Sequence, residues 1–350
     1  MEKTNGALQK NNTVFADECN FWTLDLLKVL LAVVVILRHC GQQFYSPESL
    51  FVKIITCSIS PIAVPTFFTI SGFLLFRKEV SVNVLKRQAF RVIRLYLLWS
   101  LIYSPIIVRY AQKKESVSKL LISFLRKFFF GGAYYHLWFL PSLAVALCIT
   151  YTLWKLVRNN NYLLLIALVL YVIGTIVDTY HFFSPYTDWK LYKDIFLTTR
   201  NGVFFGFFFV VIGKVIAEGQ IVLEKKSVIF CSLILGCILL ILEGWFLCWA
   251  NRYSVVNMNF SSIFISPSLL IIAIQTSKRF SYSNGKELRN MSTVLFCCHP
   301  WMMVVILLAN RMMCQFNSMW STIMTLILSA TAAYVCVRLS KNYKVFRELM

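Results

Sequence analysis

Charged residues are scarce in this chain, and acidic residues are the scarcest. Only 14% of its 350 residues are charged, with 35 Lys or Arg against 15 Asp or Glu. Soluble domains carry about 25% charged residues, and no polar block here is long enough to form a separate soluble domain. Hydrophobic residues make up 58% of the chain, and the mean hydropathy is +0.68. The composition excludes an ordinary soluble protein and indicates an integral membrane protein.

Patterns typical of metal sites, disulfide frameworks and secretion are also lacking. The eleven cysteines form no C-x-x-C pair and lie mostly in apolar runs, which indicates packing residues. The four histidines are far apart, with no H-x-x-x-H spacing. We therefore expect no metal and no permanently bound cofactor. The polar first twenty residues contain no apolar stretch with a cleavage site, so we expect no secretory signal.

Apolar runs of about 20 residues, long enough to cross a bilayer, recur along almost the whole chain. Because they are long, and are not alternating ten-residue segments, they predict helices rather than a β-barrel. The predicted fold is an all-α polytopic membrane bundle with a tail at 1–21, a transmembrane domain at 22–338 and a second tail at 339–350. The predicted spans, about ten in number, are 22–41, 54–76, 90–108, 136–157, 162–180, 200–218, 227–249, 258–276, 291–310 and 319–338.

Basic residues are distributed unevenly between the predicted loops. With ten spans and the N-terminus inside, both tails lie in the cytoplasm, and the inner loops are richer in Lys and Arg. This distribution explains the net charge of +20, so we expect contact with membrane lipids and not with nucleic acid. The outer loop 109–135 is also basic, and its stretch 117–130 predicts an amphipathic helix at the membrane surface.

The first apolar run contains three ionisable side chains at helical spacing. Lys28 follows Asp25 by three residues, and His39 lies eleven residues beyond Lys28. On an α-helix eleven residues make about three turns, so Lys28 and His39 share a face about 16 Å apart. Ionisable groups in a membrane helix are costly and usually face a protein interior or a watery cavity. This face is the main candidate for a functional site, with Asp25 available to pair with Lys28.

A row of arginines follows the second span. Arg87, Arg91 and Arg94 lie at positions i, i+4 and i+7 of a helix that leads into the third span. Guanidinium groups in a row suit a polyanion, because each can make bidentate bonds to phosphate oxygens. A donor with several phosphates, such as coenzyme A, would fit. The alternative is plain anchoring at the cytoplasmic membrane surface.

Five further residues are candidates for substrate contact or structural roles. Ser71 lies in the second span but lacks the surroundings of a nucleophilic serine. His136 and Trp138 belong to an aromatic cluster that opens the fourth span, which an interfacial girdle would also explain. Arg200 opens the sixth span and is either interfacial or directed into a cavity. His299 precedes a helix-kinking proline near the middle of the ninth span.

In their order along the chain, these motifs resemble acyltransferase family 3 of bacterial membrane proteins. Members of that family move acyl groups, commonly acetyl, from cytoplasmic acyl-coenzyme A to hydroxyls on cell-surface sugars or other acceptors. The resemblance therefore implies a multi-pass O-acyltransferase of the bacterial inner membrane that uses acetyl-CoA as donor and modifies a polysaccharide. It rests on Asp25, Lys28 and His39, on Phe67, Phe68, Ser71, Gly72 and Phe73, on Arg91-x-x-Arg94, on the stretch 136–140 and on His299.

The resemblance also implies roles for individual residues. Lys28 and His39 correspond to an essential basic residue and an essential histidine, and Arg91 and Arg94 correspond to a pair assigned to the donor. We expect His39 to act as general base on the acceptor hydroxyl or to carry the acyl group transiently, since imidazole titrates near neutral pH. The chain departs from the family in having Lys28 where Arg is usual and in lacking an acidic residue at 64–66.

The sequence leaves two other classes of function open. A transporter or flippase for a lipid-linked sugar would line its path with the same intramembrane charges and would consume no acyl groups. A membrane sensor would bind a ligand and would be expected to carry a soluble domain facing a partner. No appended hydrolase-like domain is expected either, so the enzyme would act alone or with a partner, as a monomer or an oligomer.

Overall fold

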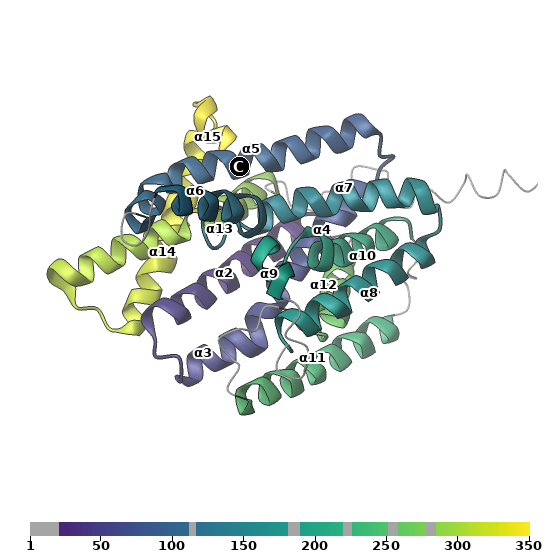
Figure 1. Ribbon diagram of the computed structural model, residues 1–350, viewed down its shortest axis with the longest axis horizontal. Helices are drawn as coiled ribbons and strands as arrows, with labels where there is room; N and C mark the ends of the chain where they lie inside the picture. Colours follow the sequence, from purple (N-terminus) through teal and green to yellow (C-terminus); the bar gives the residue numbers. More distant parts are fainter. Residues whose placement is uncertain (1–20, 112–116, 181–189, 220–225, 251–257, 278–284) are drawn as a thin grey trace, which may run out of the picture.

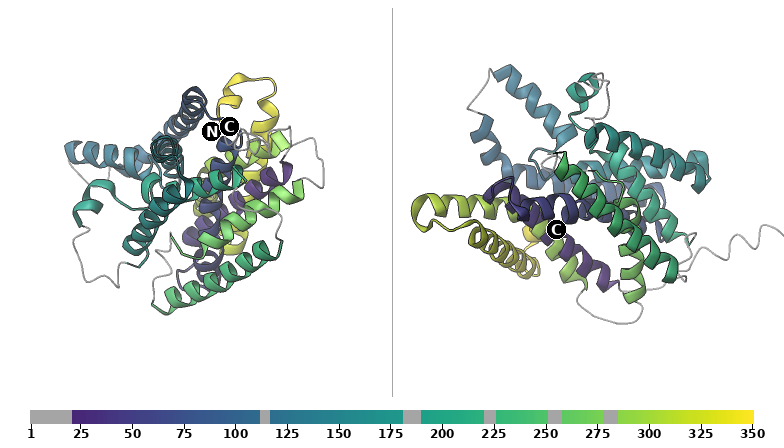
Figure 2. Two further views of the ribbon diagram at one scale, coloured as in Figure 1. Left: turned by 90° about the vertical axis from the view of Figure 1, so that its right-hand side faces the viewer. Right: turned by 90° about the horizontal axis from the view of Figure 1, so that it is seen from below.

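The computed structural model describes residues 21–111, 117–180, 190–219, 226–250, 258–277 and 285–350. These ranges form helices and contain no strand, which confirms the predicted all-α class. The long helices make one bundle, with α5 (Val82–Ala111) and α11 (Lys226–Trp249) at opposite edges (Figures 1 and 2). The predicted tail at 1–21 lies outside the described residues except for Phe21.

All ten predicted spans fall on helices. Three of them fall on α2 (Trp22–Phe44), on the segment Gly202–Ala217 and on α12 (Ser262–Ser277). The count of ten, and the cytoplasmic position of both termini, stay predictions. By length and composition, seven helices in the described ranges could cross a membrane: Leu50–Phe76, Val82–Arg109, Phe139–Val157, Asn160–Asp178, Lys226–Trp249, Gly285–Met312 and Ser318–Leu339.

The second predicted span is broken in its first half. The helical stretch that contains it begins four residues earlier and comprises α3 (Leu50–Ile54), the π-helix η1 (Ile55–Ile59), the 3₁₀ turn η2 (Ser60–Ile62) and α4 (Ala63–Phe76). Pro61 stands in the first turn of η2 and has no N–H to donate to the π-helix before it. The break brings the Ser60 hydroxyl to α2, where Arg38 Nη1 donates to Ser60 Oγ at 2.9 Å.

The core of the bundle contains a short helix with no solvent-exposed side. The π-helix η6 (Gly202–Gly206) leads into α10 (Phe207–Ala217), and every residue of α10 is buried. Glycines set its distance from α4: a Cβ on Gly72 would lie 2.3 Å from Val210 O, and a Cβ on Gly213 would lie 2.1 Å from Thr69 O. Small residues allow membrane helices to approach to backbone contact, so this pair fixes the position of α4.

Polar contacts join the start of α2 to α12 and join α5 to the last residues of the chain. At the start of α2, Thr23 Oγ1 hydrogen-bonds Ser277 Oγ and donates to Ala273 O, which joins α2 to α12. At the end of the described chain, α15 (Lys344–Glu348) packs beside α5: Glu348 pairs with Arg94, and Trp99 Nε1 donates to Leu349 O at 3.3 Å. The predicted second tail therefore packs against the bundle.

The remaining helices surround this core. The stretch predicted to be amphipathic forms a helix, although residues 112–116 of its loop lie outside the described ranges. These elements are α6 (Val117–Arg126), η3 (Lys127–Gly131), α7 (Phe139–Val157), α8 (Asn160–Asp178), α9 (Lys190–Phe196), α13 (Gly285–Ala309), η8 (Asn310–Cys314) and α14 (Ser318–Leu339).

The backbone contact between α4 and α10 predicts a sharp difference between two buried glycines. Gly213→Ala places a methyl group against the α4 backbone, and we expect it to lower the free energy of unfolding by about 1–3 kcal/mol. Gly41→Ala is the control, because its Cβ would meet no atom closer than 3.6 Å. Denaturant unfolding in mixed micelles measures both. Equal stability of the two variants would contradict the packing described.

Candidate functional site

A cavity of about 680 Å³ lies between α2, α4, α5, α7 and α13. Ser71 and Gln88 line it, together with apolar side chains. Asp25 is the one acidic residue among the described residues that line it. We call this space the basic cavity, after six cationic side chains in its lining: Lys28, Arg77, Lys78, Arg87, Arg91 and Arg289.

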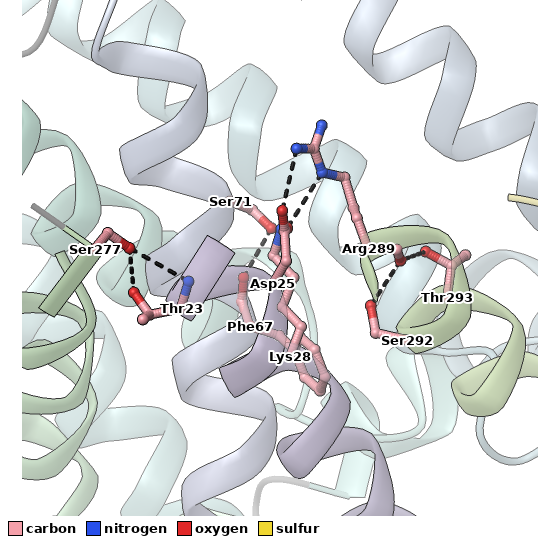
Figure 3. A network of polar contacts seen from close by, with 9 residues as sticks. All are labelled: Thr23, Asp25, Lys28, Phe67, Ser71, Ser277, Arg289, Ser292 and Thr293. Atoms are coloured by element: carbon pink, nitrogen blue, oxygen red, sulfur yellow. Dashed lines mark hydrogen bonds and ion pairs between the residues drawn. The ribbon is translucent and has the colours of Figure 1, made fainter. Parts of the chain in front are cut away.

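A single carboxylate organises two of these cations. Asp25 Oδ1 lies 3.1 Å from Lys28 Nζ, and Arg289 reaches both Asp25 oxygens, with Nε–Oδ1 and Nη2–Oδ2 distances of 3.2 Å (Figure 3). The Asp25 side chain is 4% exposed and the Arg289 side chain 47%. Asp25 stands in the first turn of α2, where the helix dipole also favours a negative charge. The predicted Asp25–Lys28 pair is present, and Arg289 joins it from α13.

The row of arginines on α5 is divided. Arg87 and Arg91 line the basic cavity, whereas Arg94 is paired with Glu348 of α15. Ser71 also lines this cavity, but its hydroxyl donates to Phe67 O of its own helix at 2.7 Å. That bond is the usual one for a serine within a helix, so the geometry adds nothing to a role for Ser71 as a nucleophile.

A second cavity, of about 310 Å³, lies further along α2. His39 lines it from α2, His136 and Trp138 line it just before and at the start of α7, and Arg200 lines it just before η6. We call it the histidine cavity. Its remaining lining residues are Val35, Arg38, Gln42, Ser60, Pro61, Val64, Tyr135, Phe139 and Phe296.

Three histidines that are far apart in sequence meet beside this cavity. The rings of His39 and His299 are stacked with centroids 5.3 Å apart, and His136 meets His299 edge-on at 5.2 Å. His136 and His299 are buried, with 2% and 0% of their surface exposed. Within the described ranges no group of three or more His, Cys, Asp or Glu side chains could hold a metal ion.

The proline inside α13 explains how these rings are held. Pro300 has no N–H, so the carbonyl of Phe296, four residues earlier, loses its helical partner. His299 Nδ1 lies 2.9 Å from that oxygen and donates to it, since a carbonyl oxygen can only accept. The next carbonyl, Cys297 O, accepts from His136 Nε2 at 3.2 Å and from Tyr103 Oη at 2.7 Å. His299 Nε2 and His136 Nδ1 have no hydrogen-bond partner among the described residues.

A layer of three phenylalanines separates the two cavities. Phe139 and Phe296 line both, and Phe67 lines the basic cavity. Their ring centroids are 5.6 Å apart for Phe139–Phe296, 5.8 Å for Phe67–Phe139 and 6.2 Å for Phe67–Phe296. Lys28 and His39 therefore lie on opposite sides of this layer, each facing a cavity on one side of α2, as their spacing predicts.

Sequence reasoning missed residues from both cavities. Arg289 belongs to none of the motifs described above, although its spacing of seven from Phe296 places both on one face of α13. Arg38 was overlooked beside His39. Phe139 and Phe296 carried no signal of their own, since isolated aromatics in apolar helices are ordinary.

The chain is similar to one protein family and to several longer proteins. The family model described as an acyltransferase domain matches residues 21–338. An amino-acid racemase of Enterococcus faecalis is 24% identical over 347 residues, and a serine/alanine racemase of Enterococcus gallinarum is 25% identical over 339 residues. Each match covers 93% of this chain and 47% of the relative.

A further amino-acid racemase of E. faecalis is 33% identical over 218 residues, which is 59% of this chain and 29% of the relative. The chain thus spans about half the length, or less, of the curated relatives it matches. No solved structure matches it.

The shared carboxylate predicts a stability effect. Asp25→Asn leaves Lys28 and Arg289 close together without their common anion. Removing one partner of a buried ion pair costs about 3–5 kcal/mol, and the half-exposed Arg289 reduces this, so we expect a loss of about 2–3 kcal/mol. The control is Glu287→Gln, which breaks the exposed 2.8 Å pair with Lys341 and should cost under about 1 kcal/mol. Unfolding in mixed micelles measures the stability of both variants. An Asp25→Asn protein as stable as the wild type would contradict the ion pairs assigned to Asp25.

Proposed function

The chain belongs to this acyltransferase family, and from that premise we propose that it transfers an acyl group from acyl-coenzyme A to a hydroxyl of a cell-surface glycan or a related acceptor. The donor acyl group is acetyl in the simplest case. The single observation that carries the proposal is that a cation-lined cavity and a histidine-lined cavity adjoin along one face of α2. The proposed location is the inner membrane of a bacterium.

The basic cavity has the chemistry to hold the donor. Arg87, Arg91 and Arg289 bring guanidinium groups from two helices, and Lys28 adds an ammonium group from α2. Coenzyme A carries several phosphate groups, and guanidinium groups bind such anions with bidentate, charge-assisted hydrogen bonds. Arg94 joins this set only when a donor phosphate replaces Glu348 as its partner.

The histidine cavity has the chemistry to activate the acceptor. In direct transfer, His39 takes the proton of the acceptor hydroxyl as its oxygen attacks the thioester carbonyl carbon. The C–S bond then breaks, and the proton passes to the departing thiolate, giving an ester and free coenzyme A. In the two-step route, a His39 nitrogen attacks the thioester carbonyl carbon, the C–S bond breaks, and the thiolate leaves with the imidazole proton as free coenzyme A. The acceptor hydroxyl then attacks the acyl-histidine, the C–N bond breaks, and the hydroxyl proton returns to the imidazole. Both routes consume one thioester for each ester formed.

In this proposal the phenylalanine layer lies between the phosphates of the donor and its thioester. The phosphates are proposed to stay in the basic cavity, and the long pantetheine arm is proposed to carry the thioester past Phe139 and Phe296 to His39. Aromatic side chains can rotate to admit a narrow arm and otherwise close the passage to water, which protects the thioester from hydrolysis. Two cavities separated by a thin layer would also suit the rival function, a transporter or flippase that opens to each side in turn.

The relatives' names suggest a second class of acceptor. A protein named serine/alanine racemase acts on serine, whose side chain ends in a hydroxyl. Since the relatives are about twice as long as this chain, racemisation is attributed to them alone. Serine therefore joins glycans among the acceptors to be offered.

The test is release of free thiol from acetyl-coenzyme A by the purified full chain in detergent micelles, with glycans and serine offered as acceptors. We expect acceptor-dependent thiol release and at least a 100-fold loss in His39→Ala, because general acid–base catalysis contributes about 10²–10⁴ in rate. Gln43→Ala is the matched control, since Gln43 lies on the same helix, is exposed and lines neither cavity.

Two results would contradict the proposal. Full thiol release by a normally folded His39→Ala would remove His39 from the chemistry. Acceptor movement across proteoliposomes with no thiol release would favour the transporter.

A further inference from the structure

We propose that Cys57 and Cys248 form a thiol pair that disulfide oxidants convert to a disulfide on the outer side of the membrane, which ties η1 to α11. The two cysteines line neither cavity, so this inference does not rest on the proposed function. The sequence indicates only packing residues at these positions, because 191 positions separate the two cysteines along the chain.

The two sulfur atoms are in contact. Cys248 Sγ lies 3.6 Å from Cys57 Sγ, so no other atom fits between them. Both residues carry free thiols, and Cys57 is buried whereas Cys248 is half-buried. Two cysteines can be bridged only when their side chains point toward each other. Sulfur atoms in contact meet that condition.

The packing of α11 on η1 holds the pair together. Gly244 lies four residues before Cys248 and therefore on the same face of α11. A Cβ on Gly244 would lie 3.4 Å from Cys57 Cβ and 3.1 Å from Ser58 Oγ, so the α11 backbone passes close to η1. Cys57 and Leu247 also form a small buried apolar cluster. The fold thus gives each thiol a high effective concentration at the other.

The predicted topology places the pair at the outer surface. With ten spans and the N-terminus inside, the second span begins and the seventh span ends on the outer side. Cys57 lies near the start of the second span, and Cys248 is the last residue but one of α11. Exposed Trp245 and Trp249 flank Cys248, as is typical of a helix end at the membrane surface. Disulfides form and persist outside the cytoplasm, whereas cytoplasmic thiols are kept reduced.

Oxidation proceeds by exchange with a disulfide oxidant, which is a protein or small molecule that carries an S–S bond. The Cys248 thiolate attacks one oxidant sulfur, the S–S bond of the oxidant breaks, and its other sulfur leaves as a thiolate. The Cys57 sulfur, after losing its proton, attacks Cys248 Sγ and displaces the remaining oxidant thiolate. Two cysteine thiols are oxidised, one oxidant disulfide is reduced, and the two cysteine protons end on the oxidant thiols. Cys248 reacts first because Cys57 is buried.

The disulfide ties one wall of the histidine cavity to α11. The π-helix η1 runs directly into η2, whose Ser60 and Pro61 line that cavity. Ser60 Oγ also accepts from Arg38 Nη1 of α2. A covalent bond between η1 and α11 limits the movement of this wall, and reduction of the bond releases it.

Oxidation of the purified full chain tests the inference. The protein in detergent micelles is incubated with oxidised glutathione, remaining thiols are blocked with N-ethylmaleimide, and linked peptides are quantified by mass spectrometry. We expect the Cys57–Cys248 linkage at least about tenfold above any linkage of Cys231 to Cys237, which point to different sides of α11. Cys57 and Cys248 that both remain thiols, or that link to other cysteines instead, would overturn the inference.

Variants identify the order of attack. In Cys57→Ser, Cys248 should accumulate as the mixed disulfide with glutathione, and in Cys248→Ser, Cys57 should remain a thiol. Cys231→Ser is the matched control, because Cys231 is an exposed cysteine of the same helix, and it should leave the linkage unchanged. Thermal melting checks that each variant is folded. The wild-type result decides the inference even where a variant fails to fold.

Spheroplasts of an expressing bacterium test the side of the membrane. They are reduced with dithiothreitol, washed and exposed to oxidised glutathione, which does not cross the membrane. We expect the linkage to form in intact spheroplasts. Linkage that forms only after the membranes are opened would place the pair on the cytoplasmic side and overturn the inference.

Hydrogen exchange tests the tether. In the wild type, linkage should slow deuterium exchange of the η1 amides at least about threefold, because a cross-link restricts local opening. Cys248→Ser treated in the same way should show no change. Unchanged exchange in a fully linked wild type would contradict the tether.

Discussion

An ionisable side chain inside a membrane helix must be matched by an opposite charge or by a polar cavity, and α2 carries such groups near both ends of one face. Asp25 and Lys28 meet this requirement at one end through a mutual ion pair extended by Arg289. Arg38 and His39 meet it at the other end by lining a cavity. Both cavities take one wall from α2, and the helices around it are placed to close the rest.

Several of the departures from regular α-helix lie at the histidine cavity. The π-helix and 3₁₀ turn before α4 bring Ser60 and Pro61 into its wall, and Pro300 frees the carbonyl that holds His299. Arg200 stands just before the π-helix η6. Irregular backbone at membrane depth is tolerated where it is buried in protein or lines a cavity. The regular, tightly packed contact between α4 and α10 holds these irregular segments against one another.

The α-helical period was enough to place Asp25, Lys28 and His39 on one face, because contacts within three turns of a helix depend on local geometry alone. The meeting of His39, His136 and His299 was not predictable in this way, since it depends on how α2, α7 and α13 pack. The same holds for Arg289, which reaches Asp25 across 264 residues of sequence, and for Arg94, whose partner Glu348 lies on α15. Residue types marked the three histidines and Arg94 as candidates but not Arg289, and only the fold showed which side chains share a cavity.

The central claim is that the acyl group passes from the basic cavity to His39 through the phenylalanine layer. A structure of the full chain in lipid nanodiscs with a non-hydrolysable acetyl-coenzyme A analogue tests this claim most directly. We predict that the phosphates contact Arg91 and Arg289, that Phe139 or Phe296 is rotated aside, and that the acyl carbonyl lies within about 3.5 Å of the His39 ring. An analogue whose acyl group ends on the Lys28 side of an unchanged phenylalanine layer, or that binds outside the basic cavity, would contradict the account.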